Sequence, residues 1–181
     1  MTIGEMLHAV RDWLHNFWRL PLKMDYTFIT DRLAVGGGIA TQADVEALKA
    51  AGITHIIDMR MEFNDNTVLL SDHWDLQHYL YLPQVDNGTP RDPLQYIQGI
   101  EFALCALSSL ENRVYCHCAA GMNRGPLMGY AIMRAFGLTE RAAVAMIRLK
   151  RPVVTFYTIA NYMNSVNSLF PKDTSCCEQP K

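Results

Sequence analysis

The chain has 181 residues, of which half are hydrophobic and 19% are charged, and its formal net charge is −2 at pH 7. This length suits one well-buried domain and is too short for two. The charge balance excludes a general basic field for holding long nucleic acid, so an anion would have to bind at a local site.

Residues 1–22 are expected to form an amphipathic helix packed on the flank of the domain. The segment opens with the capping-box pattern Thr2-x-x-Glu5, and apolar residues recur at spacings of three and four as far as Phe17. An alternative is that this helix docks onto a partner. Its mixed charges and interrupted apolar runs argue against a membrane span or a signal peptide, so the cytoplasm is the expected location.

From residue 23 onward the chain alternates between predicted strands and helices. That alternation is typical of a parallel sheet covered by helices. We therefore expect an α/β domain over residues 23–170, with a central, mostly parallel sheet of four to five strands flanked by helices on both faces. Residues 171–181 are expected to be a flexible tail. The strands predicted before the central motif are 26–29, 33–35, 53–58 and 79–82, the last one stopped by Pro83.

Helices are predicted on both sides of the central motif. Thr41 is expected to cap the first of them. A long helix is expected from Pro93 to Leu110, with Cys105 on its buried side. Further helices are expected after the motif, and the last one spans about 157–169. Lys150 and Arg151, at the end of one of these helices, are interpreted as a solvated helix end, with contact to a second phosphate as the alternative.

The stretch from Arg113 to Pro126 is the motif around which the chain is organised. It is predicted to be a buried strand, a tight loop of small residues and the first turn of a helix. A loop of this length can curl so that its N–H groups point at one centre, to which the helix adds the positive end of its dipole. The predicted phosphate-binding loop comprises His117, Cys118, Ala119, Ala120, Gly121, Met122, Asn123 and Arg124.

The residue types in this loop suit phosphoryl transfer through a covalent phosphocysteine. A thiol inside a ring of N–H donors is expected to have a lowered pKa, so the Cys118 thiolate can attack phosphorus. Arg124 can bind two phosphate oxygens at once. Gly121 allows the backbone to turn closely around the anion. His117 is expected to face away from the substrate and to bond to nearby backbone.

The leaving oxygen also needs a proton, which a carboxylic acid from another loop can supply. Asp86 is the first candidate because it follows a predicted strand, 32 residues before Cys118. Asp92 is the next candidate, and Asp58 is a weaker one because its strand is expected to be buried. This chemistry needs neither a metal nor another cofactor.

The cysteines favour a reducing compartment. They show no zinc-type spacing and no regular disulfide framework. On a strand, Cys116 and Cys118 would share one side and His117 would lie opposite, which is a poor tetrahedral metal set. A separate hypothesis is that Cys116 or Cys105 traps oxidised Cys118 as a disulfide.

The pattern His117-Cys118-x-x-Gly121-x-x-Arg124 resembles the active-site motif of the cysteine-dependent protein tyrosine phosphatase superfamily. The spacing to Asp86 and the run at 31–37 resemble its dual-specificity branch, and the resemblance extends over about residues 25–170. It implies a dual-specificity phosphatase-like fold. It also implies that Cys118 is the nucleophile, Arg124 the phosphate-binding group and Asp86 the general acid.

Two features of the loop depart from the most common family pattern. Gly125 stands where most members carry Ser or Thr, a hydroxyl that assists the second step, so slower breakdown of the phosphoenzyme is expected. Ala119 and Ala120 provide no Lys or Arg, unlike many phosphoinositide-directed relatives. The run from Ala120 to Pro126 is similar to that of glucan phosphatases, and Asn123 to that of RNA 5′-triphosphatases.

The expected function is hydrolysis of phosphate monoesters, with phosphotyrosine, phosphoserine or phosphothreonine proteins as substrates. The alternatives are a phosphoinositide, glucan or RNA 5′-phosphate substrate, or a phosphate-binding scaffold with weak catalysis. The substrate is the only partner that the motif itself implies.

Overall fold

The computed structural model describes residues 24–65, 78–171 and 173. The amphipathic helix expected within 1–22 lies outside these residues, as does most of the expected tail. None of the described helices is both long and apolar enough to cross a membrane.

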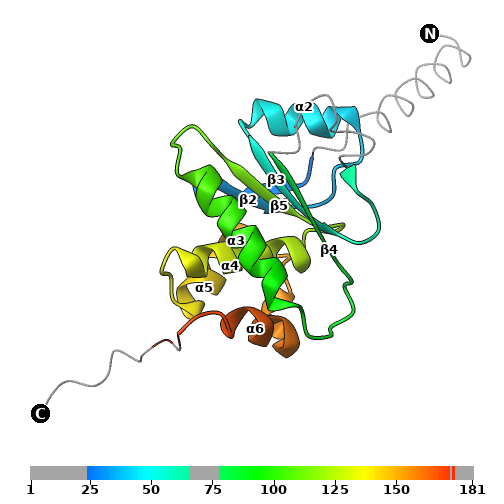
Figure 1. The fold of residues 1–181 in the computed structure, drawn as a ribbon. Helices are drawn as coiled ribbons and strands as arrows, with labels where there is room; N and C mark the ends of the chain where they lie inside the picture. The colour runs from blue at the N-terminus through cyan, green and yellow to red at the C-terminus, as the bar shows by residue number, and fades with distance from the viewer. Residues whose placement is uncertain (1–23, 66–77, 172, 174–181) are drawn as a thin grey trace, which may run out of the picture.

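A five-stranded sheet forms the centre of the domain (Figure 1). Its strand order is β1-β2-β5-β3-β4. Only β1 is antiparallel to its neighbour, and all the other pairs are parallel. The predicted fold class is therefore confirmed. The strands are β1 (Tyr26–Phe28), β2 (Leu33–Gly36), β3 (His55–Arg60), β4 (Tyr79–Gln84) and β5 (Val114–His117).

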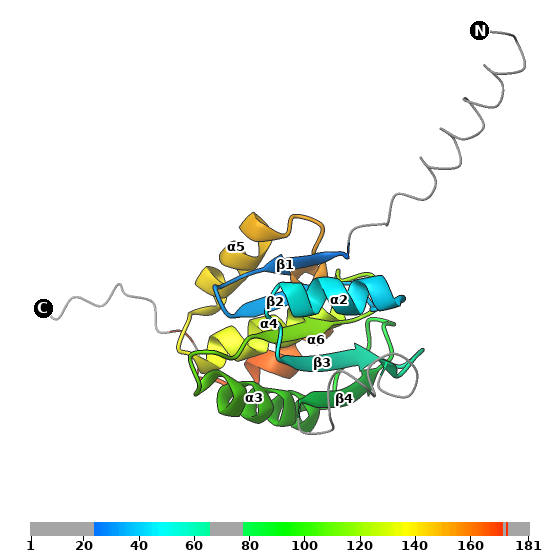
Figure 2. The same ribbon diagram turned by 90° about the horizontal axis from the view of Figure 1, so that it is seen from above.

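Helices cover both faces of the sheet, and Figure 2 shows the same layers from above. Of the described helices, only α2 covers one face, whereas α4 packs on the other face with α3, α5 and α6 around it (Figure 1). Thr41 and Asp44 form a capping box at the start of α2, as the prediction of a Thr41 cap requires. The helices are α2 (Gln42–Ala50), α3 (Pro93–Leu107), α4 (Arg124–Ala135), α5 (Glu140–Lys150) and α6 (Ala160–Asn167).

The central strands are mostly apolar because their side chains enter a hydrophobic core on each side of the sheet. Side chains alternate along a strand, so Cys116 joins the core beneath α4 while its neighbour Tyr115 joins the core beneath α2. Ile57 and Ile56 divide between the two cores in the same way.

Three predicted details are wrong. Helix α3 ends at Leu107, and Cys105 is exposed because the buried stripe follows Tyr96, Gly99 and Ala103. Pro83 lies inside β4, which an edge strand tolerates because it needs no N–H on its outer side. The predicted last helix is divided into a 3₁₀ turn at Phe156–Thr158 and α6.

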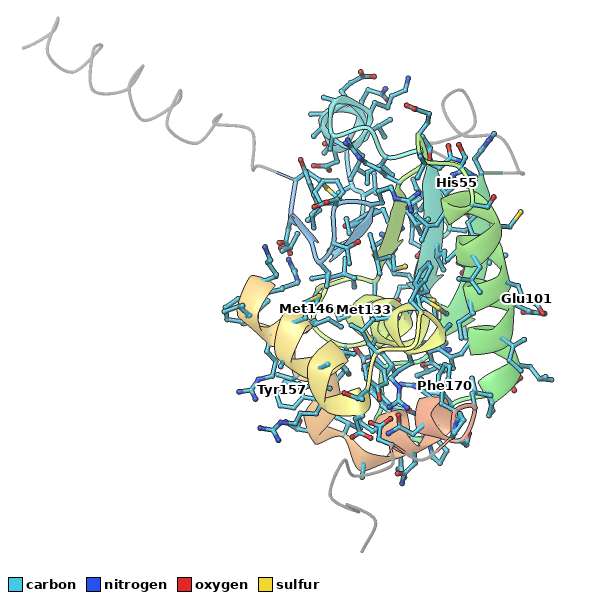
Figure 3. The ribbon with its side chains drawn as sticks, turned by 90° about the vertical axis from the view of Figure 1, so that its left-hand side faces the viewer. His55, Glu101, Met133, Met146, Tyr157 and Phe170 are labelled. Carbon is cyan, nitrogen blue, oxygen red and sulfur yellow. The ribbon has the colours of Figure 1, made fainter. Side chains whose placement is uncertain are left out.

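A cavity of about 330 Å³ lies between α4 and α5, where Met133 and Met146 are neighbours (Figure 3). It is also lined by residues 30–33, which precede and begin β2. This cavity is therefore at the edge where the parallel strands begin. The loops that carry the phosphate-binding motif follow the opposite ends of the strands, where parallel sheets usually bind ligands.

Candidate active site

We call residues 118–124 the phosphate loop. Two of its backbone carbonyl groups point outward and accept hydrogen bonds from neighbouring backbone. The Gly38 N–H donates to the Ala119 oxygen over 3.0 Å, and the Thr155 N–H donates to the Met122 oxygen over 3.1 Å. A trans peptide unit points its N–H opposite to its C=O, so the N–H groups that follow face the inside of the loop. Among the described residues, no backbone acceptor takes the N–H groups of 119–123. They are free to bind an anion.

Arg151 fixes a third carbonyl of the phosphate loop. Its Nε donates to the Gly121 oxygen over 2.7 Å, and its Nη1 donates to Asp25 over 2.8 Å. The hydrogen bond from Arg151 lowers the pKa of the Asp25 carboxyl. The Arg151 side chain is 4% exposed, so it is not the solvated helix end that the sequence suggested.

Gly121 is required where the phosphate loop passes β2. Its φ of +62° lies in the left-handed region, and a Cβ there would come within 2.4 Å of the Gly36 carbonyl carbon. The approach to β2 is therefore a reason for this glycine that the sequence did not indicate, and the expected close turn around an anion stays a prediction.

Cys118 lies directly after β5 and is almost fully buried. Its N–H donates to the Gly36 oxygen over 3.3 Å, which ties the start of the phosphate loop to β2. Cys116 lies two residues earlier, and burial raises the pKa of its thiol well above the usual range. A thiol of this kind is a poor nucleophile, which weakens the hypothesis that Cys116 traps oxidised Cys118.

Two other segments meet the Arg124 guanidinium, one that follows β3 and one at the end of β4. Its Nη1 donates to Glu62 over 2.8 Å and to the Gln84 carbonyl over 2.9 Å, and its Nε lies 3.5 Å from Asp86 Oδ2. The hydrogen bond from Arg124 lowers the pKa of Glu62, whose side chain is 56% exposed. Glu62 can therefore turn into water when a phosphate takes its place. Nothing in the sequence indicated Glu62, because no local pattern distinguishes it from other surface glutamates.

Of the three candidate acids, only Asp86 faces the phosphate loop. The Asn123 amide nitrogen lies 3.4 Å from each of its carboxylate oxygens. Asp92 instead caps α3 by accepting the Leu94 N–H over 2.9 Å. Asp58 is fully buried and accepts hydrogen bonds from Arg60 and from a tyrosine of β4.

His117 is fully buried, and its ring stacks on Tyr115. Its Nε2 lies 3.3 Å from Asp65 Oδ2 and 3.8 Å from Asp58 Oδ1, two partners that the sequence did not indicate. Burial lowers the pKa of His117 to about 4 and outweighs the opposite effect of Asp58. The imidazole is therefore neutral at pH 7.

Asp58, Asp65 and His117 also offer three ligand atoms within 4.8 Å of one another, an arrangement that could hold a metal ion. The Arg60 guanidinium forms ion pairs with both carboxylates. It already supplies the positive charge that a metal would bring, so this donor set fits Arg60 better than a divalent cation.

The backbone of Gly125 lies directly against β5. A Cβ at this position would come within 2.7 Å of His117 Cα and 2.9 Å of the Cys116 oxygen. A Ser or Thr therefore fits only if α4 moves away from the strand. The close packing of α4 on β5 gives a physical reason for the glycine.

Comparisons with known proteins show the family and the fold of the chain. Residues 38–169 match the family model for the dual specificity phosphatase catalytic domain. A protein of Invertebrate iridescent virus 3, provisionally named tyrosine phosphatase 067L, is 28% identical over 126 residues, which are 67% of this chain and 51% of the relative. A second iridescent virus relative is covered over 40% of its length, so the chain spans about half or less of these curated relatives.

Solved structures share the fold. The PTP-2 phosphatase of Cydia pomonella superposes with a TM-score of 0.69 at 14% identity, over 80% of this chain and 89% of that one. A human tyrosine phosphatase-like serine/threonine/tyrosine-interacting protein superposes with a TM-score of 0.66 at 22% identity. The match covers 81% of this chain and 95% of that one. Because residues 38–169, which are most of the chain, match the family model, the chain belongs to the dual-specificity phosphatase catalytic-domain family.

Proposed function

We propose that the chain hydrolyses phosphate monoesters in two steps through a phosphocysteine on Cys118. In the first step the sulfur bonds to phosphorus, the bond to the leaving oxygen breaks, and Asp86 gives that oxygen its proton. In the second step water attacks phosphorus, the sulfur–phosphorus bond breaks, and Asp86 takes the proton of the water. Arg124 and the inward N–H groups stabilise the charge on the phosphoryl oxygens in both steps.

One observation carries this proposal. The phosphate loop, which begins with Cys118, supplies the inward N–H groups and the Arg124 guanidinium, and a second segment that follows β4 brings the Asp86 carboxylate to them. Asp86 Oδ2 and Arg124 Nε are 3.5 Å apart, so a phosphate bound by the guanidinium would lie within reach of the acid.

We further propose that the substrate is a protein carrying a single phosphate, as expected for a dual-specificity enzyme. The other arginines near the phosphate loop are already paired, which argues against a second phosphate site. Arg60 pairs with Asp58 and Asp65, Arg151 with Asp25, and Arg91 with the Tyr162 hydroxyl.

The surroundings of the phosphate loop support the same substrate class. Several large apolar side chains are exposed in the loops that reach Arg124 or Asp86, which suits an apolar peptide better than a sugar or a polyphosphate. These side chains are Met61, Phe63, Val85 and Met122. We retain the cytoplasm as the proposed location, since a catalytic thiol requires a reducing compartment.

A substrate panel tests the proposal. The phosphopeptides would carry phosphotyrosine, phosphoserine or phosphothreonine with apolar neighbours, and the other substrates would be an inositol polyphosphate, a phosphoglucan and an RNA 5′-triphosphate. We expect kcat/KM to be highest for a phosphopeptide. A higher value for any of the other three would refute the substrate assignment. Phosphate binding without turnover of any substrate would favour the scaffold alternative.

A further inference from the structure

The hydroxyl of Tyr162, a buried residue of α6, has all its hydrogen-bonding capacity in use. It donates to Asp86 Oδ1 over 2.7 Å, and it accepts bonds from the Gly88 N–H over 2.9 Å and from Arg91 Nη2. A tyrosine hydroxyl has one proton and two lone pairs. Because both lone pairs are occupied, its proton is directed at Asp86.

This contact distinguishes the two oxygens of the Asp86 carboxylate. Oδ1 accepts the hydrogen bond from the Tyr162 hydroxyl. Oδ2 lies 3.5 Å from the Nε atom of Arg124, the last residue of the phosphate loop. When the carboxyl is protonated, Oδ1 remains an acceptor and the acid proton sits on Oδ2. The proton is then on the oxygen nearer to a bound phosphate.

The rest of α6 holds the segment that carries Asp86. The Asn161 amide donates to the Gly88 oxygen over 2.9 Å, and the Arg91 N–H donates to Ser165 Oγ over 2.8 Å. The Arg91 guanidinium lies over the Tyr162 ring, 4.2 Å from its centroid. Burial and the bond to Asp86 raise the pKa of Tyr162, so the hydroxyl remains a donor at neutral pH.

We propose that Tyr162 is a positioning residue that fixes Asp86 with its transferable proton on Oδ2, facing the phosphate loop. The inference rests on the proposed role of Asp86 as general acid. In the first step the Oδ2 proton passes to the leaving oxygen as its bond to phosphorus breaks. In the second step Oδ2 takes a proton from the attacking water. Helix α6 thus holds the acid in its working orientation before a substrate binds.

The test measures kcat/KM for aryl phosphates whose leaving groups range from good, as in p-nitrophenyl phosphate, to poor, as in phenyl phosphate. Tyr162→Phe deletes one oxygen and keeps the ring under Arg91. We expect it to lose about tenfold on phenyl phosphate, near the upper end of the cost of one hydrogen bond between neutral groups, and much less on p-nitrophenyl phosphate. Tyr130→Phe is the matched control, because Tyr130 is buried too and its hydroxyl binds Asn167 instead. The control is expected to show the wild-type dependence on the leaving group.

The double variant Tyr162→Phe/Asp86→Asn separates positioning from packing. If Tyr162 acts through Asp86, the double variant is as active as Asp86→Asn alone. A leaving-group dependence in Tyr162→Phe equal to that of the wild type, or multiplied losses in the double variant, would overturn the inference. Arg91→Gln removes one of the two donors to the Tyr162 hydroxyl and keeps the Tyr162 ring, and it also removes the guanidinium that lies 4.0 Å from Asp86 Oδ1. This variant is expected to change the leaving-group dependence in the same direction. It replaces Tyr162→Phe as the test if Tyr162→Phe does not fold.

Asp86→Asn alone distinguishes the two levels of the proposal. If it shows no added sensitivity to poor leaving groups, Asp86 is not the general acid, and the proposed mechanism fails together with the inference. If Asp86→Asn shows this sensitivity and Tyr162→Phe does not, the mechanism stands and only the positioning role is refuted.

Discussion

Replacing Arg151 with Met tests how far the phosphate loop depends on a side chain outside it. Met keeps much of the buried chain length but removes the donors to Gly121 and Asp25. The lost bond to the buried Gly121 carbonyl is expected to cost about 2–3 kcal/mol. The Asp25 side chain is 62% exposed and regains water, so its ion pair adds little. A loss of about 2–3 kcal/mol would lower Tm by about 4–12 °C in a domain of this size.

Arg151→Met is also expected to lower activity, because it removes the hydrogen bond that holds the Gly121 carbonyl. Without Arg151, the peptide unit between Gly121 and Met122 can rotate, and the Met122 N–H no longer has a fixed direction. The loss of one preorganised donor costs about 100-fold in kcat at the lower end of the usual range, so a fall of about 100-fold is expected. The assay is hydrolysis of p-nitrophenyl phosphate at a temperature below the lowered Tm.

Asp25→Asn is the matched control, because it weakens the ion pair and keeps the bond from Arg151 to Gly121. It is expected to retain activity within about threefold of the wild type, as is usual for a partly exposed ion pair. Wild-type activity in Arg151→Met would refute the reasoning, and so would an equal loss in Asp25→Asn.

Three further predictions concern neighbours of the phosphate loop. Burial lowers the pKa of His117 to about 4, whereas an unfolded histidine titrates near about 6.5. The unfolded state therefore binds the proton first. The free energy of unfolding should fall by up to about 3 kcal/mol as pH drops from about 6.5 to 4. Urea unfolding at several pH values should show this fall in the wild type and not in His117→Gln. Gly125→Ser should destabilise the fold by about 1–3 kcal/mol, as thermal unfolding would show; equal stability would contradict the close packing of α4 on β5. Glu62→Gln should tighten inhibition by inorganic phosphate about two- to fivefold, and an unchanged inhibition constant would mean that Glu62 does not compete for Arg124.

The sequence was informative where structure depends on neighbouring residues. The phosphate loop, the Thr41 cap and the alternation of strands and helices are local patterns, and the predicted fold class is confirmed. The exposure of Cys105 was predicted wrongly, because α3 is apolar on more than one side and its own sequence does not show which stripe meets the sheet.

The supports of the site depend on contacts between distant segments. The bonds from Arg151 to Gly121, from Arg124 to Glu62 and from Tyr162 to Asp86 span 30, 62 and 76 residues. No local period or motif specifies them, because they exist only once the helices have packed on the sheet. The reason for Gly125 is equally nonlocal: it is the distance between α4 and β5.

The most direct test of the account is to trap the phosphoenzyme. The protein would be denatured rapidly during turnover of p-nitrophenyl phosphate, and its peptides analysed by mass spectrometry. The account predicts phosphate on the peptide that contains Cys118, at the sulfur, and neither phosphate nor turnover in Cys118→Ser. Turnover that survives in Cys118→Ser, or a wild-type enzyme that never carries phosphate on Cys118, would contradict it.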